Sequence, residues 1–137
     1  LMSRYTVLID GTAGAYGVVF PDLPGCTAMG ETLDEALINA VEALRQWVEI
    51  ASARGRAIPE PRSPDAIRAD ARFAEDFAAG ATLGSVTLVR KLGRSVKANL
   101  SLDSGILAAI DATASRLGIS RSALVEKLAE DRLAELA

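Results

Sequence analysis

The chain has 137 residues, with 15 Lys and Arg, 18 Asp and Glu, one cysteine and no histidine. The absence of histidine excludes Ser-His-Asp and Cys-His catalytic sites and His-ligated zinc sites. A single cysteine cannot form an internal disulfide, so we expect a reducing, cytoplasmic location and not a secreted scaffold. No apolar run approaches the roughly 20 residues of a membrane span, so we expect no membrane partner.

The charges are unevenly distributed along the chain. Residues 1–84 carry seven basic and twelve acidic side chains, whereas residues 85–137 carry eight basic and six acidic ones. The positive excess is largest within 90–121, where six basic side chains face only Asp103 and Asp111. An acidic front and a locally basic back predict two different partners.

The N-terminal segment has the pattern of a small antiparallel sheet. Runs of β-branched and aromatic residues predict strands at 5–9 and 16–20, joined by a short loop that contains two glycines. Pro24 and Gly25 supply a fixed φ followed by a residue that tolerates positive φ, which predicts a type II turn. A short third strand is expected at 26–30.

A long helix is predicted at about 33–54. Thr32 and Glu35 have the spacing of a capping box, in which each side chain can accept a hydrogen bond from the other residue's amide. Apolar residues then recur at helical spacing and form one stripe. Gly55 is a suitable residue to end the helix.

The stretch after this helix is less regular. Three prolines lie within 59–64 and interrupt the helical pattern. Ser63 before a proline is a good start for a helix, which predicts a short acidic helix at about 64–79. The run at 86–89 predicts a strand that returns to the front sheet.

The segment 94–102 alternates strictly between polar and apolar residues, which predicts a strand with one polar and one apolar side. Asp103 is a candidate cap for a helix that ends at Gly118, and Ser120 is a candidate cap for a second helix. Both helices have an apolar side. The order is therefore strand, helix, tight turn and helix.

A unit of about 45 residues with one strand leaves the strand edges unpaired and much of its apolar side exposed. In a pair of copies the two strands can pair antiparallel, and the four helices can cover the apolar side. We therefore expect a homodimer through 96–102 and the following helices. A two-stranded ribbon fits the DNA major groove, and its outward side chains can contact base edges.

This combination resembles the ribbon-helix-helix DNA-binding domain. The resemblance implies that three outward strand residues read bases of operator DNA, namely Lys97, Asn99 and Ser101. The predicted phosphate contacts are Arg94, Ser120, Arg121 and Ser122, the last three at the positive end of the second helix. The plain alternative is an amphipathic strand with two core helices that bind nothing.

The front half resembles the N-terminal domain of HicB-type antitoxins. The resemblance rests on the run 16–28, then Gly30-Glu31-Thr32 and Glu35-Ala36, and covers roughly 2–55. Its most specific part is Pro21–Cys26, within which we predict Asp22, Leu23 and Pro24 as toxin contacts.

Together the two resemblances predict an α+β chain. A partly RNase H-like domain at 2–92, with an antiparallel sheet and a long helix, precedes a ribbon-helix-helix domain at 93–137. The implied function is an antitoxin without catalytic activity, cofactor or metal. It would sterically neutralise a small, basic HicA-type mRNA-cleaving toxin and repress its own operon, as a homodimer or a tetramer.

Two other functions fit parts of the sequence. A metal-dependent nuclease would need converging carboxylates such as Asp10, Asp22, Glu31 and Asp34, but the second and fourth of these suit a turn and a helix start better. A stand-alone repressor would share the DNA-binding half and use its front domain to sense a ligand or to oligomerise. Cys26 is expected to be a buried core residue, because the chain lacks a histidine to activate it.

Overall fold

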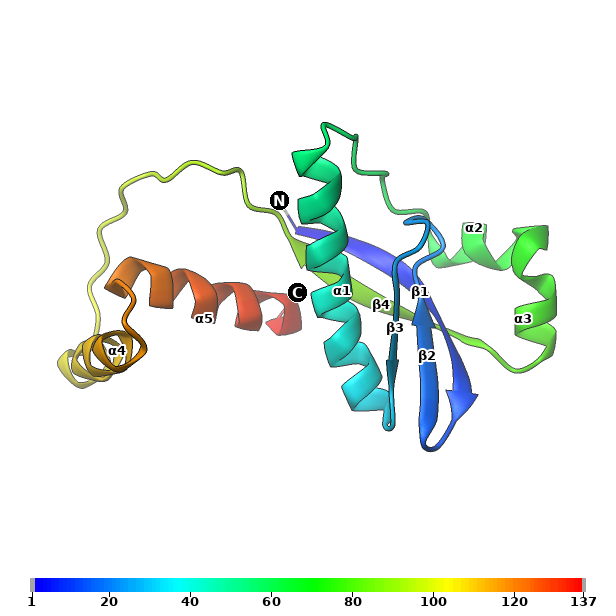
Figure 1. Ribbon diagram of the computed structural model, residues 1–137, viewed down its shortest axis with the longest axis horizontal. Coiled ribbons are helices and arrows are strands. Elements are labelled where there is room, and N and C mark those ends of the chain that lie inside the picture. The colour runs from blue at the N-terminus through cyan, green and yellow to red at the C-terminus, as the bar shows by residue number, and fades with distance from the viewer. Residues whose placement is uncertain (1, 137) are drawn as a thin grey trace. The chain divides into compact units, whose positions relative to one another are not determined.

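The computed structural model describes residues 2–136 (Figure 1). Their contacts divide the chain into two units, Leu1–Leu88 and Val89–Ala137, so the division falls four residues before the boundary expected at 92. The chain is of the mixed α+β class, with an antiparallel sheet confined to the first unit.

The first unit contains the four strands expected from the sequence, in the spatial order β3-β2-β1-β4. Their bounds are Met2–Thr12 for β1, Ala15–Val19 for β2, Thr27–Gly30 for β3 and Thr82–Val89 for β4. The first hairpin is tighter than predicted, because Thr12 pairs with Ala15 and leaves a two-residue turn. Gly14 lies in this turn with φ of 93°, a conformation that glycine adopts without strain.

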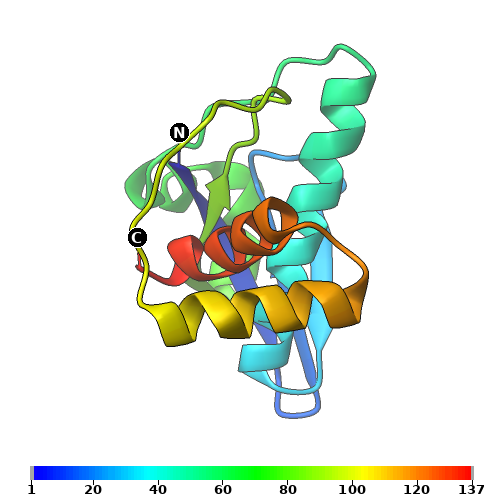
Figure 2. The same cartoon turned by 90° about the vertical axis from the view of Figure 1, so that its left-hand side faces the viewer.

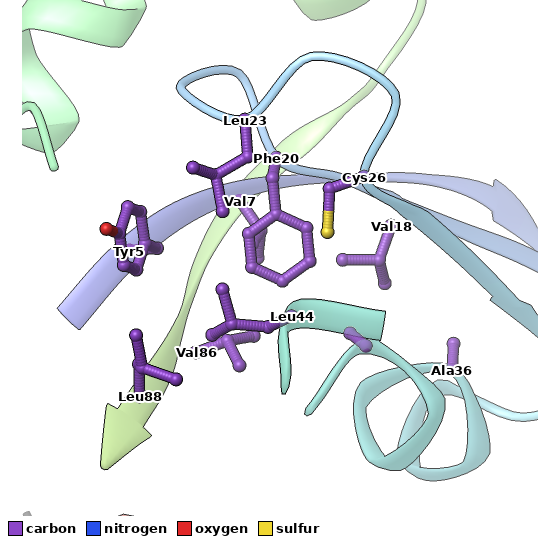
Figure 3. Close-up of a cluster of buried hydrophobic side chains, with 11 residues drawn as sticks. Tyr5, Val7, Val18, Phe20, Leu23, Cys26, Ala36, Leu44, Val86 and Leu88 are labelled. Atoms are coloured by element: carbon purple, nitrogen blue, oxygen red, sulfur yellow. The ribbon is translucent and has the colours of Figure 1, made fainter. Parts of the chain in front are cut away.

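Helix α1 (Leu33–Ala53) begins at Thr32, whose hydroxyl accepts a hydrogen bond from the Glu35 amide at 3.1 Å. The helix packs on one face of the sheet and closes the main core (Figure 3). The core side chains come from the strands, from the turn after β2 and from α1, and include Val7, Val18, Phe20, Leu23, Ala36, Ala40, Leu44 and Val86. Figure 3 shows Phe20 pointing from the sheet side toward Leu44 of the helix.

The prediction of one helix at 64–79 is wrong. The chain forms three short pieces there: α2 (Pro64–Arg68), a 3-10 turn (Ala71–Phe73) and α3 (Ala74–Ala78). The break follows from Asp70, whose side chain accepts from the Arg72 amide at 3.0 Å and so starts a new turn. Ile67 of α2 is fully buried, and it lies outside the main core cluster.

An ion-pair network joins the turn after β2 to this irregular stretch. The side chain of Asp22 is only 5% exposed and accepts twice from Arg62, from its amide at 2.8 Å and from its Nε at 2.5 Å. Arg62 also pairs with Asp70 at 3.0 Å, and Asp70 pairs with Arg72 at 2.7 Å. These hydrogen bonds raise the pKa of Arg62 and hold the pKa of Asp70 well below its ordinary value.

The second unit contains α4 (Ser104–Leu117) and α5 (Arg121–Leu136), joined by a short turn (Figure 2). The start of α4 is capped as predicted, because the Asp103 carboxylate accepts from the amides of Gly105 and Ile106 at 2.8 and 3.2 Å. Gly118 ends the helix with φ of 68°, and the Ser120 hydroxyl accepts from the Ala123 amide at 3.1 Å.

The strand expected at 96–102 has no partner in the single chain. Residues 90–103 form no helix or strand, and 93–103 are exposed throughout. The reason is physical, because a strand needs a hydrogen-bonding neighbour and the neighbour expected here is a second copy. Figure 1 shows this segment as an extended connection that leads to α4.

The carboxylate of Asp22 is expected to stabilise the fold, because it is only 5% exposed and is paired with Arg62. Asp22→Ala removes the acceptor of the Arg62 amide and guanidinium, so the free energy of unfolding is expected to fall by about 2–3 kcal/mol. Urea unfolding followed by circular dichroism measures this loss. Glu60→Ala, which removes an exposed acid near Arg62, serves as the control and should change stability by about 0.5 kcal/mol or less. Equal losses in the two variants would contradict a structural role for Asp22.

Asp70 makes the stability depend on pH. Because Arg72 and Arg62 lower the pKa of Asp70 in the folded chain, the unfolded chain binds its proton first as the pH falls. The stabilisation is therefore complete above the unfolded pKa of about 3.9 and is lost progressively below it. Asp70→Asn should be less stable at pH 7 and should lose less stability between pH 5 and pH 3. An unchanged pH slope, measured by urea unfolding, would contradict the assignment.

Candidate functional site

The three predicted base-reading residues lie on the exposed segment between the sheet and α4. Lys97, Asn99 and Ser101 are all exposed. Because they occupy alternate positions, they share one side when the segment is extended. This polar row offers an ammonium donor, an amide with donors and an acceptor, and a hydroxyl.

The opposite side of the same segment is apolar and uncovered. Val96 is 85% exposed and Leu100 is 69% exposed. Further exposed apolar residues of this unit are Ile106 and Leu117 of α4, Ile119 of the following turn, and Leu128, Leu133 and Leu136 of α5. Of the described residues of this unit, only Ala114 and Leu124 are buried. A unit with so small a core cannot support a stable fold alone.

An ion pair links the residues that precede this segment to α5. Lys91 Nζ lies 2.8 Å from Glu130 Oε2. A groove of about 320 Å³ runs between residues 89–95 and α5, and its lining includes Arg94 and Leu133. Arg94, a predicted phosphate contact, is thus held near the second helix and remains exposed.

The start of α5 contains the other predicted phosphate contacts. The Ser120 hydroxyl is used as the helix cap, and Ser122 is exposed in the first turn. The first amides of an α-helix have no partner within the helix and carry partial positive charge. This end is therefore suited to an anion.

Arg121 is already engaged in the single chain. Its Nε and Nη2 lie 2.7 and 2.9 Å from the two carboxylate oxygens of Asp111, so the ion pair is bidentate and links α5 to α4. Hydrogen bonding raises the pKa of Arg121 and lowers the pKa of Asp111. The Arg121 side chain stays 58% exposed, so the pair leaves other N–H groups of the guanidinium accessible.

The residues predicted as toxin contacts have structural roles in the first unit. Leu23 is fully buried in the core, and the carboxylate of Asp22 is paired with Arg62. Pro24 is exposed, and its carbonyl accepts from Trp47 Nε1 at 3.0 Å. A direct toxin contact of these three residues stays a prediction, and of the three only Pro24 has an exposed side chain.

The acids considered for a nuclease do not converge. Within residues 2–136, no group of three or more Asp, Glu, Cys or His side chains could hold a metal ion. Over the same residues, no helix is long and apolar enough to cross a membrane.

Cys26 is buried in the core beside Leu23 and Phe20, as expected for a packing residue. Burial raises the pKa of its thiol to about 11. The thiol is therefore protonated at neutral pH and unsuited to nucleophilic chemistry.

This burial predicts slow chemical labelling of Cys26. At pH 8, native protein should react with Ellman's reagent at least about 100-fold more slowly than protein unfolded in guanidinium, because both thiolate content and access are reduced. The absorbance of the released thionitrobenzoate measures both rates. Similar rates in the two states would show that the thiol is accessible and reactive.

Comparison with known proteins places the chain in a family. The model of HicB-like antitoxins of bacterial toxin–antitoxin systems matches residues 5–129. An uncharacterised 14.9 kDa protein from the rep-hol intergenic region of Haemophilus phage HP1 is 30% identical over 107 residues, which cover 78% of each chain.

Solved structures agree with this family in fold and over most of the length. The crystal structure of antitoxin HicB3 matches with a TM-score of 0.55 and 29% identity, and covers 94% of this chain and 96% of that one. A chain of the HicA3–HicB3 toxin–antitoxin complex matches with a TM-score of 0.51 and 30% identity, over 60% of this chain and 93% of that one. The chain therefore belongs to the HicB-like antitoxins of bacterial toxin–antitoxin systems.

Proposed function

We propose that this chain is an antitoxin with two binding activities and no catalysis of its own. Its N-terminal unit binds a HicA-type mRNA-cleaving toxin and blocks it sterically. Its C-terminal unit binds operator DNA and represses the operon that encodes the pair. Since the messenger RNA and the operator are both cytoplasmic, we place both activities there.

The observation that carries the DNA-binding half is the uncovered apolar side of 96–102. Val96 and Leu100 are 85% and 69% exposed, and the two helices expose further apolar residues. An exposed apolar surface of this kind marks an interaction site. A second copy supplies both missing elements, because its strand satisfies the unpaired backbone groups and its helices cover the apolar side. The product is a ribbon-helix-helix dimer.

In such a dimer the polar row faces outward twice. Lys97, Asn99 and Ser101 can then contact base edges in the major groove, where donors and acceptors distinguish all four base pairs. The start of α5 and the free N–H groups of Arg121 would contact phosphates, together with Arg94, Ser120 and Ser122. These contacts predict steep loss of affinity with salt, because phosphate binding releases counterions.

The toxin-binding half rests on family membership and on charge. The chain is similar to a chain of the HicA3–HicB3 toxin–antitoxin complex. Residues 1–84 carry twelve acidic against seven basic side chains, which suits a basic partner. A partly RNase H-like domain that covers the RNA-binding surface of the toxin needs shape and charge but no catalytic group. Pairing of the front units as well would give a tetramer that spans two operator sites.

The experiment uses one change in the polar row. Asn99→Ala removes an amide that can bond a base edge, so specific operator affinity should fall by about 1–3 kcal/mol. Affinity for unrelated DNA and neutralisation of the toxin should be unchanged. Electrophoretic mobility shifts and a growth-rescue assay measure these effects.

The outcomes separate the proposed functions. Unchanged operator affinity in Asn99→Ala would overturn readout by this segment. A chain that represses but neither binds nor rescues cells from the toxin encoded beside it would favour the stand-alone repressor. Salt dependence of the wild-type affinity for operator DNA provides an independent check on phosphate contacts.

A further inference from the structure

We propose that the solvent-facing side of α1, defined by Glu35, Ile38, Glu42 and Glu49 and called here the outer face, is the surface that docks the toxin. This inference rests on the proposed antitoxin function and goes beyond it by naming the surface. The occupant is a basic protein whose contact patch combines Lys or Arg side chains with an apolar pocket.

The position of the outer face follows from the packing of α1. Ala36, Ala40 and Leu44 are fully buried against the sheet, so they define the inner side of the helix. Successive residues of an α-helix are rotated by about 100° around its axis, so Ile38 and Glu42 lie on the side opposite to these three. The exposure of the side chains agrees, since all four residues that define the outer face are exposed.

The outer face contains one exposed apolar residue among charged ones. Ile38 is 66% exposed, and its neighbours on the exposed surface of the helix are charged. A single exposed isoleucine would be ordinary. An exposed apolar centre surrounded by charged residues is instead the arrangement of a protein interface, in which a few central side chains carry most of the affinity.

The charges around Ile38 favour a basic occupant. Residues 31–53 contain five acidic side chains and one basic side chain. That basic residue, Arg45, already pairs with Glu42 at 2.9 Å. Basic residues return only after the helix, at Arg54 and Arg56. An acidic rim of this kind accelerates association with a positively charged surface and opposes association with an acidic one.

The chain offers a closely matched control on the other side of the sheet. Met29 of β3 is 68% exposed, almost the same fraction as Ile38. Its neighbour Ala28 packs against the core on the α1 side, so Met29 points to the opposite face of the sheet. Substitutions at the two positions therefore introduce the same change on opposite faces of one unit.

The first experiment compares Ile38→Glu with Met29→Glu in the full chain. Binding to the purified HicA-type toxin encoded beside this chain is measured by isothermal titration calorimetry. Ile38→Glu should weaken binding by at least tenfold, roughly the effect of losing a central interface residue. Met29→Glu should change the dissociation constant by less than about threefold. Ile38→Ala should weaken binding in the same direction, and urea midpoints show that each variant is folded.

The second experiment tests the charges alone. Glu42→Gln with Glu49→Gln should slow toxin association severalfold and flatten its dependence on salt. Glu75→Gln with Asp76→Asn removes the same charge from α3, whose side chains at these positions are also exposed, and should leave the rate nearly unchanged. Stopped-flow mixing at two salt concentrations measures both pairs.

The results distinguish the surface from the function. If wild-type protein binds the toxin and Ile38→Glu binds equally well, the outer face is overturned while the antitoxin function stands. The same conclusion follows if Met29→Glu is the variant that loses binding. If wild-type protein does not bind the toxin, the proposed function itself fails.

Discussion

The structure depends above all on one constraint: a β-strand cannot satisfy its backbone groups or cover its apolar side without a neighbour. The segment 96–102 has the alternation of a strand and yet lies exposed in the single chain. The apolar sides of α4 and α5 are partly exposed as well, and only two side chains of the described part of this unit are buried. In our account a second copy removes all of these defects at once, so folding of the unit, dimerisation and DNA binding become one event.

The N-terminal unit differs from the C-terminal one, because its own strands and helix form a complete core. Helix α1 closes over the sheet, and the turn at Asp22–Cys26 contributes two buried core side chains, Leu23 and Cys26. Asp22 ties this turn to Arg62 across 40 residues of sequence. Since this unit is closed without a partner, its surface is free for a second macromolecule. The acidic residues 1–84 and the more basic residues 85–137 nearly coincide with these two units, and we propose that each unit binds a different kind of partner.

Most elements could be predicted because their signals are local. The Thr32 cap, the Asp103 cap and the β-branched and aromatic runs of the strands are read within a few residues, and α1, α4 and α5 were confirmed close to their expected bounds. The helix at 64–79 was predicted wrongly because Asp70 competes for the backbone there. The partners of Asp22 and Arg121 could not be predicted, since Arg62 and Asp111 lie 40 and 10 residues away without a periodic pattern that joins them. The sequence around Asp22 predicts a turn, and the structure shows that Leu23 and Cys26 of this turn pack in the core while Asp22 binds Arg62.

The most direct test of the account is amide hydrogen exchange of the full chain at micromolar concentration, with its mass measured by sedimentation under the same conditions. We predict a dimer or larger assembly in which alternate amides of 96–102 are protected, as two antiparallel strands require. Dilution to the monomer should remove this protection. A chain that sediments as a monomer at high concentration, with these amides exchanging at the rate of an unfolded peptide, would contradict the account.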